Sequence, residues 1–407
     1  MLAPDAGMRV KLSRHATTLA TIPNPEISGE THQTRVYSDV NPRHLYVHVP
    51  FCARRCSYCD FAIAVRKVVP VDEYLTALTR ELESKLGNGR KHTLGTVYLG
   101  GGTPSRLGPD GIDRLLAVVH RFFDVGSDAE ITIEANPDDV TFEAASRWHA
   151  AGVNRVSLGI QSFDDSVLAW MHRTHDAAQA ECAVKAIRKA GIRNVSVDLI
   201  FALPETLKRS WRDDLERVLA LEPDHISLYG LTIEHATPIA RWQERGSITP
   251  ATEDEYAEDF LLADSMATAA GFVHYEVSNF ALPGRESRHN SAYWSGAQYL
   301  GVGPSAHSFD GETRSWNIAP YAEWIEKLGS GESVTEEAER LDVANVQAER
   351  VYLGLRTTSG LSASSEDLAR ARQWTEAGWA TIDDSTVRLT PEGWLRLDSL
   401  AAGLTGV

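Results

Sequence analysis

Three of the four cysteines in the chain lie on one short segment, and their spacing could do metal chemistry. The segment CARRCSYCDF places Cys52, Cys56 and Cys59 in a C-x3-C-x2-C pattern, whereas Cys182 is distant. Three thiolates on one loop can ligate three irons of a 4Fe-4S cubane and leave the fourth iron open for another ligand. A zinc knuckle is the alternative, but zinc sites usually pair two C-x2-C arms and the sequence has no second arm.

The elements that must position this loop alternate between strands and helices. Strand-like runs at 45–51, 96–104, 130–137, 155–163, 194–204 and 225–233 alternate with helical stretches. Strands that alternate with helices of about 10 to 15 residues predict right-handed βαβ units and a parallel sheet. Polar and glycine-rich residues gather after the strands, where such sheets place their sites.

The pattern changes after residue 233. A helix is expected at about 252–271 and one more strand at 274–282. The segment from about 340 suggests helices with a β-hairpin, similar to a winged helix. We therefore predict an α/β fold, a partial (β/α)6 TIM-like barrel with a C-terminal α+β module. The expected domains are a disordered leader (1–41), the barrel (42–283), a linker segment (284–339) and a small C-terminal domain (340–407).

Composition limits the partners. The 407 residues include 56 acidic and 40 basic side chains, a formal charge of −16, which argues against a nucleic-acid-binding surface. No apolar run reaches the roughly 18 residues that a membrane span needs, so membrane contact would be peripheral at most. Residues 8–22 are basic and faintly similar to a transit peptide, but a disordered leader is the simpler interpretation. The expected location is the cytoplasm.

The cysteine loop resembles that of the radical S-adenosylmethionine (SAM) superfamily. The resemblance implies a radical SAM barrel with a 4Fe-4S cluster on Cys52, Cys56 and Cys59, and SAM bound through the unique iron. A reduced cluster in that superfamily can cleave SAM to a 5′-deoxyadenosyl radical. Residues at the ends of successive strands would surround SAM, with Tyr58 near the adenine and Tyr46 and Arg173 at the carboxylate. The residues assigned to SAM on this basis are Tyr46, Tyr58, Gly101, Gly102, Thr103, Glu134, Gln161, Arg173 and Asp198.

The segments LYVHVPFC, YLGGGTPS, GIQSF, MHRTHD and HISLYGLTIE resemble the coproporphyrinogen III oxidase-like branch of that superfamily. Within the branch, the oxidases carry a fourth cysteine two residues after the third, and this chain has Phe61 there. The heme chaperone family HemW ends its cluster loop in C-D-F and carries an HNxxYW motif, which HNSAYW (289–294) matches. The resemblance therefore implies heme binding by His289, Asn290, Tyr293 and Trp294.

The chemistry of this motif is compatible with heme. A neutral imidazole such as that of His289 is a natural axial ligand of heme iron, and an aromatic pair can lie against a porphyrin face. One segment departs from the family pattern, because ALPETL (202–207) has Ala202 and Glu205 where glycines are expected. That departure bears on local SAM or substrate geometry, not on the cysteines or the HNxxYW motif.

The leading hypothesis is a heme chaperone. It would bind heme and pass it to a recipient such as a respiratory cytochrome or a heme-storage protein, and it would also hold a 4Fe-4S cluster and SAM. A homodimer is a further expectation. The alternative is an enzyme that decarboxylates coproporphyrinogen III without oxygen in heme biosynthesis, which the absence of the fourth cysteine disfavours. A third alternative is another radical SAM reaction on a different substrate.

Overall fold

The central feature of the computed structural model, which describes residues 42–87 and 91–406, is one large sheet. Its strand order is β11-β1-β4-β5-β6-β7-β8-β10-β9. Seven of these strands run parallel, and six of them form a partial barrel: β1 (His44–Val49), β4 (His92–Gly101), β5 (Phe123–Ala135), β6 (Arg155–Gln161), β7 (Asn194–Phe201) and β8 (His225–Gly230). The predicted α/β barrel is confirmed. The predicted leader at 1–41 lies outside the described residues.

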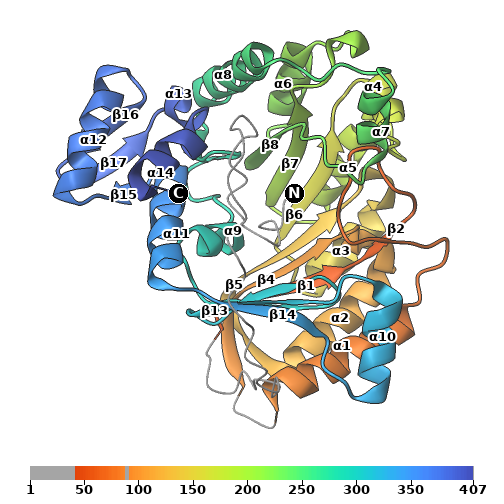
Figure 1. The fold of residues 1–407 in the computed structure, drawn as a ribbon. Coiled ribbons are helices and arrows are strands. Elements are labelled where there is room, and N and C mark those ends of the chain that lie inside the picture. The colour runs from red at the N-terminus through yellow and green to blue at the C-terminus, as the bar shows by residue number, and fades with distance from the viewer. Residues whose placement is uncertain (1–41, 88–90, 407) are drawn as a thin grey trace.

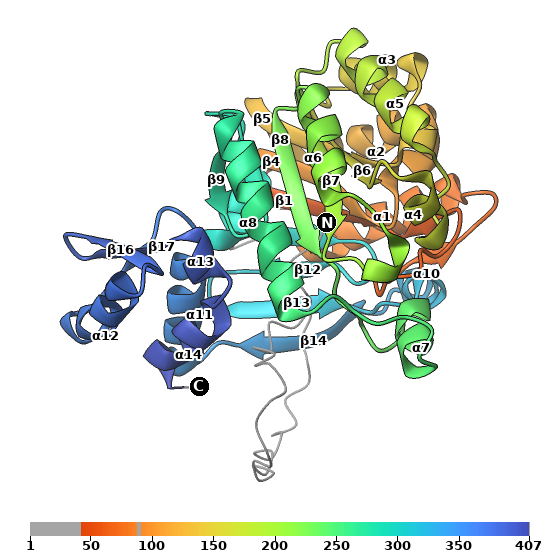
Figure 2. The ribbon, with the colours of Figure 1, turned by 90° about the horizontal axis from the view of Figure 1, so that it is seen from above.

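Helices cover the outer face of this barrel (Figures 1 and 2). They are α1 (Val71–Leu86), α2 (Gly108–Phe122), α3 (Phe142–Ala150), α5 (Ala177–Lys189), α6 (Trp211–Ala220) and α8 (Glu253–Ala269). The strands alternate in polarity because successive side chains point to opposite faces. In β6, Val156, Leu158 and Ile160 join the core beneath the helices. Ser157 and Gln161 face the barrel interior, which is therefore a polar chamber.

The edges of the sheet were harder to predict. The segment predicted as one strand at 274–282 forms an antiparallel pair, β9 (Val273–Glu276) and β10 (Asn279–Ala281), next to β8. On the opposite edge, β11 (Leu300–Val302) runs parallel to β1. A separate antiparallel sheet contains β12 (His307–Phe309), β13 (Thr313–Asn317) and β14 (Thr335–Arg340). Helix α10 (Tyr321–Ser330) connects the last two strands and packs against α1.

The C-terminal module contains helices and a small antiparallel sheet, as predicted. Its helices are α11 (Val343–Arg356), α12 (Ser365–Glu376), α13 (Pro391–Trp394) and α14 (Leu397–Thr405), and its strands are β15 (Leu361–Ser362), β16 (Ala380–Asp383) and β17 (Thr386–Leu389). Helix α11 joins the module to the barrel through an Arg356–Glu276 ion pair of 2.8 Å. The exact domain boundaries stay a prediction. Within the described residues, no helix is long and apolar enough to cross a membrane.

Three short helices and a small strand pair complete the parts that frame the site. Helix α4 (Asp165–Trp170) follows β6, and α7 (Pro238–Glu244) follows β8. Helix α9 (Arg288–Trp294) carries the HNSAYW motif and is capped by the Ser287 hydroxyl, which accepts a hydrogen bond from the Asn290 amide. Strands β2 (Phe51–Cys52) and β3 (Ala64–Val65) pair across the cysteine loop.

The ALPETL segment bends sharply after β7. Ala202 adopts φ of +55°, in the left-handed region that favours glycine. The turn is held because the Ala202 amide donates to the Asp259 carboxylate at 3.0 Å. The chain therefore keeps a glycine-like backbone at this position without a glycine.

Candidate functional site

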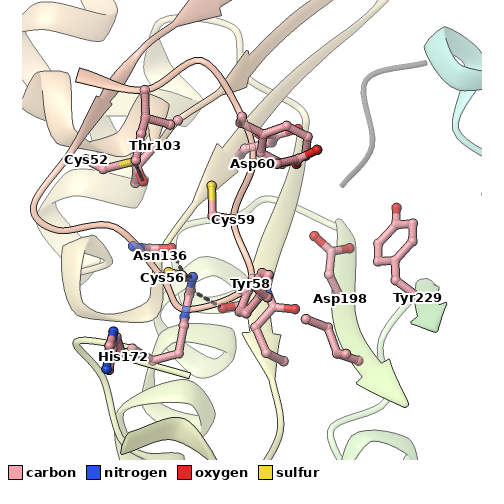
Figure 3. A pocket seen from close by; sticks show the side chains of 18 of the residues that line it. Cys52, Cys56, Tyr58, Cys59, Asp60, Thr103, Asn136, His172, Asp198 and Tyr229 are labelled. Carbon is pink, nitrogen blue, oxygen red and sulfur yellow. Dashed lines mark hydrogen bonds between the residues drawn. The ribbon is translucent and has the colours of Figure 1, made fainter. Parts of the chain in front are cut away.

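A cavity of about 370 Å³ opens at the C-terminal ends of the parallel strands (Figure 3). Cys52, Cys56 and Cys59 all line it, whereas Cys182 is exposed on α5. The close-up shows the three thiols on one side of the cavity, with Asp198 and Tyr229 on the other. The structure thus brings the predicted cluster ligands together where parallel barrels place their sites.

Hydrogen bonds hold the cysteine loop at its base and at its tip. Directly after β1, the β2–β3 pair closes its base, and the Ala64 amide donates to the Pro50 carbonyl at 2.7 Å. At its tip, the Ser57 amide donates to the Met171 carbonyl at 3.1 Å, and the Ser57 carbonyl accepts from the Ile239 amide at 3.0 Å. Elements far apart in sequence therefore fix the direction of the thiols.

The thiols sit in an environment suited to ligation. Burial raises the pKa of Cys52, and it raises the pKa of Cys59 to about 12, so both thiols are neutral unless a positive centre compensates. Bound iron supplies such a centre. Among the described residues, no group of three or more His, Cys, Asp or Glu side chains is close enough to hold a single metal ion. Three free thiols spread around one cavity suit a polynuclear cluster better than a lone zinc ion.

Eight of the nine residues predicted to bind SAM line the same cavity. They are Tyr58, Gly101, Gly102, Thr103, Glu134, Gln161, Arg173 and Asp198. Tyr46 is the exception, because it lies deeper in the barrel, where its hydroxyl is hydrogen-bonded to the Nδ1 atom of His48 at 3.2 Å. Tyr46 therefore does not face the cavity in this structure.

The glycine segment after β4 passes too close to the cysteine loop for a larger residue. A Cβ atom at Gly102 would lie 2.6 Å from the Pro50 carbonyl oxygen and 3.1 Å from the Cys52 sulfur. Gly101 has φ of +111°, which disfavours other residues. These glycines let the backbone form the cavity wall beside the thiols.

Arg173 joins the thiols to the strand ends. Its Nη1 atom donates to the Cys56 sulfur at 3.6 Å, and its Nη2 atom donates to Asn136 Oδ1 and to the Gly159 carbonyl, both at 2.7 Å. Its buried Nε atom has no hydrogen-bond partner in the described part of the chain. The guanidinium thus places positive charge beside the thiols and keeps a donor available for a ligand carboxylate.

Two acidic side chains, Glu134 and Asp198, also line the cavity. Glu134 accepts hydrogen bonds from the Tyr98 hydroxyl at 2.9 Å and from the Gly101 amide at 3.1 Å. Asp198 accepts from the Ser157 hydroxyl at 3.1 Å. Burial raises the pKa of Glu134 to about 7, against the opposing effect of these donors. Glu134 therefore changes charge near neutral pH, inside the cavity.

The raised pKa of Glu134 predicts a pH-dependent stability. The folded state holds this proton more tightly than the unfolded state, so stability is lost as the pH rises from about 4.5 to about 7, by about 3 kcal/mol. Glu134→Gln, which cannot ionise, should lack this loss. The difference in Tm between the variant and the parent should grow in the variant's favour between pH 5 and 7.5, measured without added ligand. A constant difference over that range would contradict the assignment.

Several residues that line the cavity were not predicted from the sequence. Asn136, Ser157, His172, Thr174, Tyr229 and Leu231 also line it. A signal existed for two of them, since Ser157 shares the interior face of β6 with Gln161, and Asn136 lies two residues after Glu134. Tyr229 lies one residue before the end of β8, the last of the six barrel strands, within the segment HISLYGLTIE, which suggested no ligand role for this residue.

The HNSAYW motif lies at the opposite, N-terminal end of the barrel. His289 is 1% exposed and points inward, with its Nδ1 atom hydrogen-bonded to Thr96 Oγ1 and its Nε2 atom to the Tyr293 hydroxyl, both at 2.7 Å. Its ring stacks on Tyr98 at a centroid distance of 5.0 Å. Burial lowers the pKa of His289 well below its ordinary value, so the imidazole is neutral. Both ring nitrogens are engaged, and a metal could bind only after one is released.

The other motif residues point elsewhere. The Trp294 ring packs under the Arg356 guanidinium at 4.2 Å, at the junction with the C-terminal module, and its indole nitrogen is buried without a partner in the described structure. Asn290 is half-buried, and its amide is part of the helix cap. Trp294 thus connects the motif to the C-terminal module, and none of the motif residues lines the thiol cavity. Tyr98 lies between the HNSAYW motif and the thiol cavity, because it contacts His289 on one side and Glu134 on the other.

Comparisons with known proteins agree with this geometry. The Radical SAM superfamily model matches residues 46–218. The heme chaperone HemW of Bacillus subtilis is 33% identical over 362 residues, which cover 86% of this chain and 96% of that protein. The heme chaperone HemW of Mycobacterium tuberculosis H37Rv is 36% identical over 371 residues, 90% of this chain and 95% of that protein.

The fold has a close structural relative. The solved structure of coproporphyrinogen III oxidase (HemN) from Escherichia coli, a radical SAM enzyme, superimposes with a TM-score of 0.75 over 89% of both chains, at 22% identity. That likeness covers the barrel and most of the remaining chain, so it supports the fold. The chain therefore carries a radical SAM domain and belongs to the HemW family.

Proposed function

We propose that this protein binds heme through its HNSAYW motif and delivers it to heme-requiring proteins. The observation that carries the proposal is the similarity to heme chaperones over nearly the full length of both chains. A neutral, buried imidazole at His289 supports it, because heme iron binds the unprotonated ring. Recipients of the expected kind are respiratory cytochromes or heme-storage proteins. A homodimer remains a prediction.

The cavity at the other end of the barrel would hold the cluster and SAM. The thiols of Cys52, Cys56 and Cys59 would ligate three irons, and the open iron supplies a Lewis-acidic position for the amino-acid end of SAM. Arg173 would bind the SAM carboxylate with its free donor, and Glu134 and Asp198 would accept hydrogen bonds from ribose hydroxyls. Glu134 performs this role best above pH 7, where its carboxyl is ionised.

Heme capture requires a change at α9. Thr96, which binds the Nδ1 atom of His289, belongs to β4, whereas Tyr293, which binds the Nε2 atom, belongs to α9 itself. When α9 tilts out of the barrel, the Thr96 contact breaks while the Tyr293 contact moves with the helix. We therefore propose that Nδ1 becomes the free nitrogen and that Tyr293 keeps the ring oriented, as outer-shell partners of metal-ligating histidines do.

This mechanism predicts that weakening the Thr96 contact favours heme binding. Thr96→Val keeps the volume but removes the hydroxyl that also binds His44 at 2.9 Å. Removing this hydrogen bond should destabilise the position of α9 inside the barrel by about 1 kcal/mol, which should raise heme affinity by roughly fivefold. The heme affinity is measured by titration with heme, followed at the Soret band. Thr79→Val is the matched control, because Thr79 bonds only its own helix in α1. Unchanged affinity in Thr96→Val would count against release of Nδ1.

The proposal is tested first by direct titration. Protein with a reconstituted cluster, mixed anaerobically with heme, should develop a saturable Soret band at one heme site per chain. The absence of any saturable band would contradict heme binding.

The enzyme alternative has a separate test. Phe61, which lines the cavity, stands where the resemblance places the fourth cysteine of the oxidases. We expect no conversion of coproporphyrinogen III to protoporphyrinogen IX in anaerobic assays with SAM and a reductant. Product formation would establish the oxidase activity instead.

A further inference from the structure

Arg155 is a buried cation for which the described residues provide no counter-ion. It begins β6, is 1% exposed, and none of its three side-chain nitrogens has a hydrogen-bond partner among the described residues. An unpaired charge in a protein interior costs several kcal/mol of folding free energy, so its presence here suggests a role in binding a ligand.

The side chain faces the barrel interior near its N-terminal end. Arg155 lies on the face of β6 that carries Ser157 and Gln161. Its neighbour in register on the adjacent strand β5 is Thr132. The Thr132 hydroxyl is buried and also lacks a partner in the described structure. Two adjacent strands therefore present unused donors at the same level of the barrel.

The neighbouring imidazole does not compensate the charge. His225 is hydrogen-bonded to the Ser196 hydroxyl at 2.8 Å and to the Tyr275 hydroxyl at 2.9 Å. Burial lowers its pKa well below the ordinary value, and the nearby Arg155 lowers it further, so the ring is neutral.

The carboxylates in the same region have other partners. Both oxygens of Glu130 accept backbone amides of α9, from Arg288 and from His289, each at 3.0 Å. Asp198 accepts from Ser157 and from Ser196, at 3.1 and 3.3 Å. While α9 is in place, no carboxylate among the described residues pairs with the guanidinium, whose planar donor geometry matches a carboxylate ligand.

We propose that Arg155 binds a propionate carboxylate of the heme that this protein carries. This inference rests on the proposed function. Glu130, which holds α9, and Thr132, which lies opposite Arg155, are neighbours on the interior face of β5. Release of His289 by tilting of α9, as proposed above, would break the contacts of α9 with Glu130 and open this end of the barrel at the level of Arg155. A heme with its iron on His289 can then direct one propionate inward to Arg155.

Esterified heme tests the proposal on the unaltered chain. Heme and heme dimethyl ester, which lacks free carboxylates, are each titrated into the wild-type protein with its cluster. We expect the ester to bind at least tenfold more weakly. Equal affinity for the two ligands would overturn the inference, and because it needs no mutation, this arm does not depend on how a variant folds.

Variants of Arg155 provide the second arm. Arg155→Gln should weaken binding of heme by about the same factor while leaving binding of the dimethyl ester unchanged, and Arg155→Lys should restore part of the loss. An equal loss for both ligands in Arg155→Gln would indicate a structural role only and overturn the proposal.

Three further outcomes distinguish a free carboxylate from a heme propionate at Arg155, and a failure of this inference from a failure of the proposed function. If acetate at millimolar concentration raises the Tm of the wild type but not of Arg155→Gln, while heme and its ester bind equally, the site takes a free carboxylate and the propionate assignment is wrong. If neither heme nor its ester binds at all, the proposed function fails. If both bind equally through His289, the function stands and only this inference fails.

Discussion

Cys56→Ala is expected to abolish the iron–sulfur cluster. Cys56 is one of three thiols around the cavity, and Arg173 donates to its sulfur. A cubane with three protein ligands keeps only two when Cys56 is removed. The two remaining thiols, Cys52 and Cys59, are buried and have raised pKa values, so they ionise less readily. After anaerobic reconstitution, the visible charge-transfer absorbance and the iron and sulfide contents should fall to background. The same result is expected for Cys52→Ala and Cys59→Ala.

The matched control for these variants is Cys182→Ala. Cys182 is exposed on α5, away from the cavity, so this variant should assemble a cluster like the parent. Full cluster content in Cys56→Ala, or its loss in Cys182→Ala, would contradict the ligand assignment. Zinc in place of iron and sulfide in the reconstituted parent would favour the zinc-site alternative.

His289→Ala is expected to remove tight heme binding. Loss of an outer-shell partner alone weakens metal binding by about 10–100-fold, so loss of the axial ligand itself should weaken heme affinity by more than about 100-fold. Added imidazole should restore part of the Soret band, because the small ligand can occupy the space left by the ring. That rescue separates loss of a ligand from general unfolding.

The control for this variant is His120→Ala, an exposed histidine at the end of α2. It should bind heme like the parent. The His289 variant also leaves Thr96 and Tyr293 without their ring partner, so its Tm should fall while its cluster still assembles. Unchanged heme affinity in His289→Ala would show that another residue ligates the iron.

The barrel could be predicted from sequence because its strands and helices alternate with clear periodicities. The edge strands could not. Residues 300–302 form a three-residue strand within a glycine-rich run, and a strand that short has no detectable period. The β12–β13–β14 sheet was missed because β12 has only three residues and β14, although longer, is exposed at every residue and mostly charged, so it has no apolar alternation.

Most residues assigned to SAM line one cavity because they follow strands that the pattern located, whereas SAM binding itself stays a prediction. Tyr46 was assigned to SAM by resemblance, but it lies in β1 at the level of Tyr98, below the cavity. The burial of His289 could not be anticipated, because a seven-residue helix of mixed polarity carries no signal for which face turns inward. Nor does sequence reveal that Arg155 has no hydrogen-bond partner among the described residues, since pairing depends on side chains from neighbouring strands.

Transfer of heme to a recipient tests the central claim most directly. The protein, loaded with one heme per chain and freed of excess heme by gel filtration, is mixed with an apo-cytochrome of the b type. The shift of the Soret spectrum to that of the holo-cytochrome is then followed in time. We expect transfer that is complete at equimolar recipient and faster than from heme bound to albumin. A protein that binds no heme, or that retains bound heme in the presence of excess apo-cytochrome, would contradict the account.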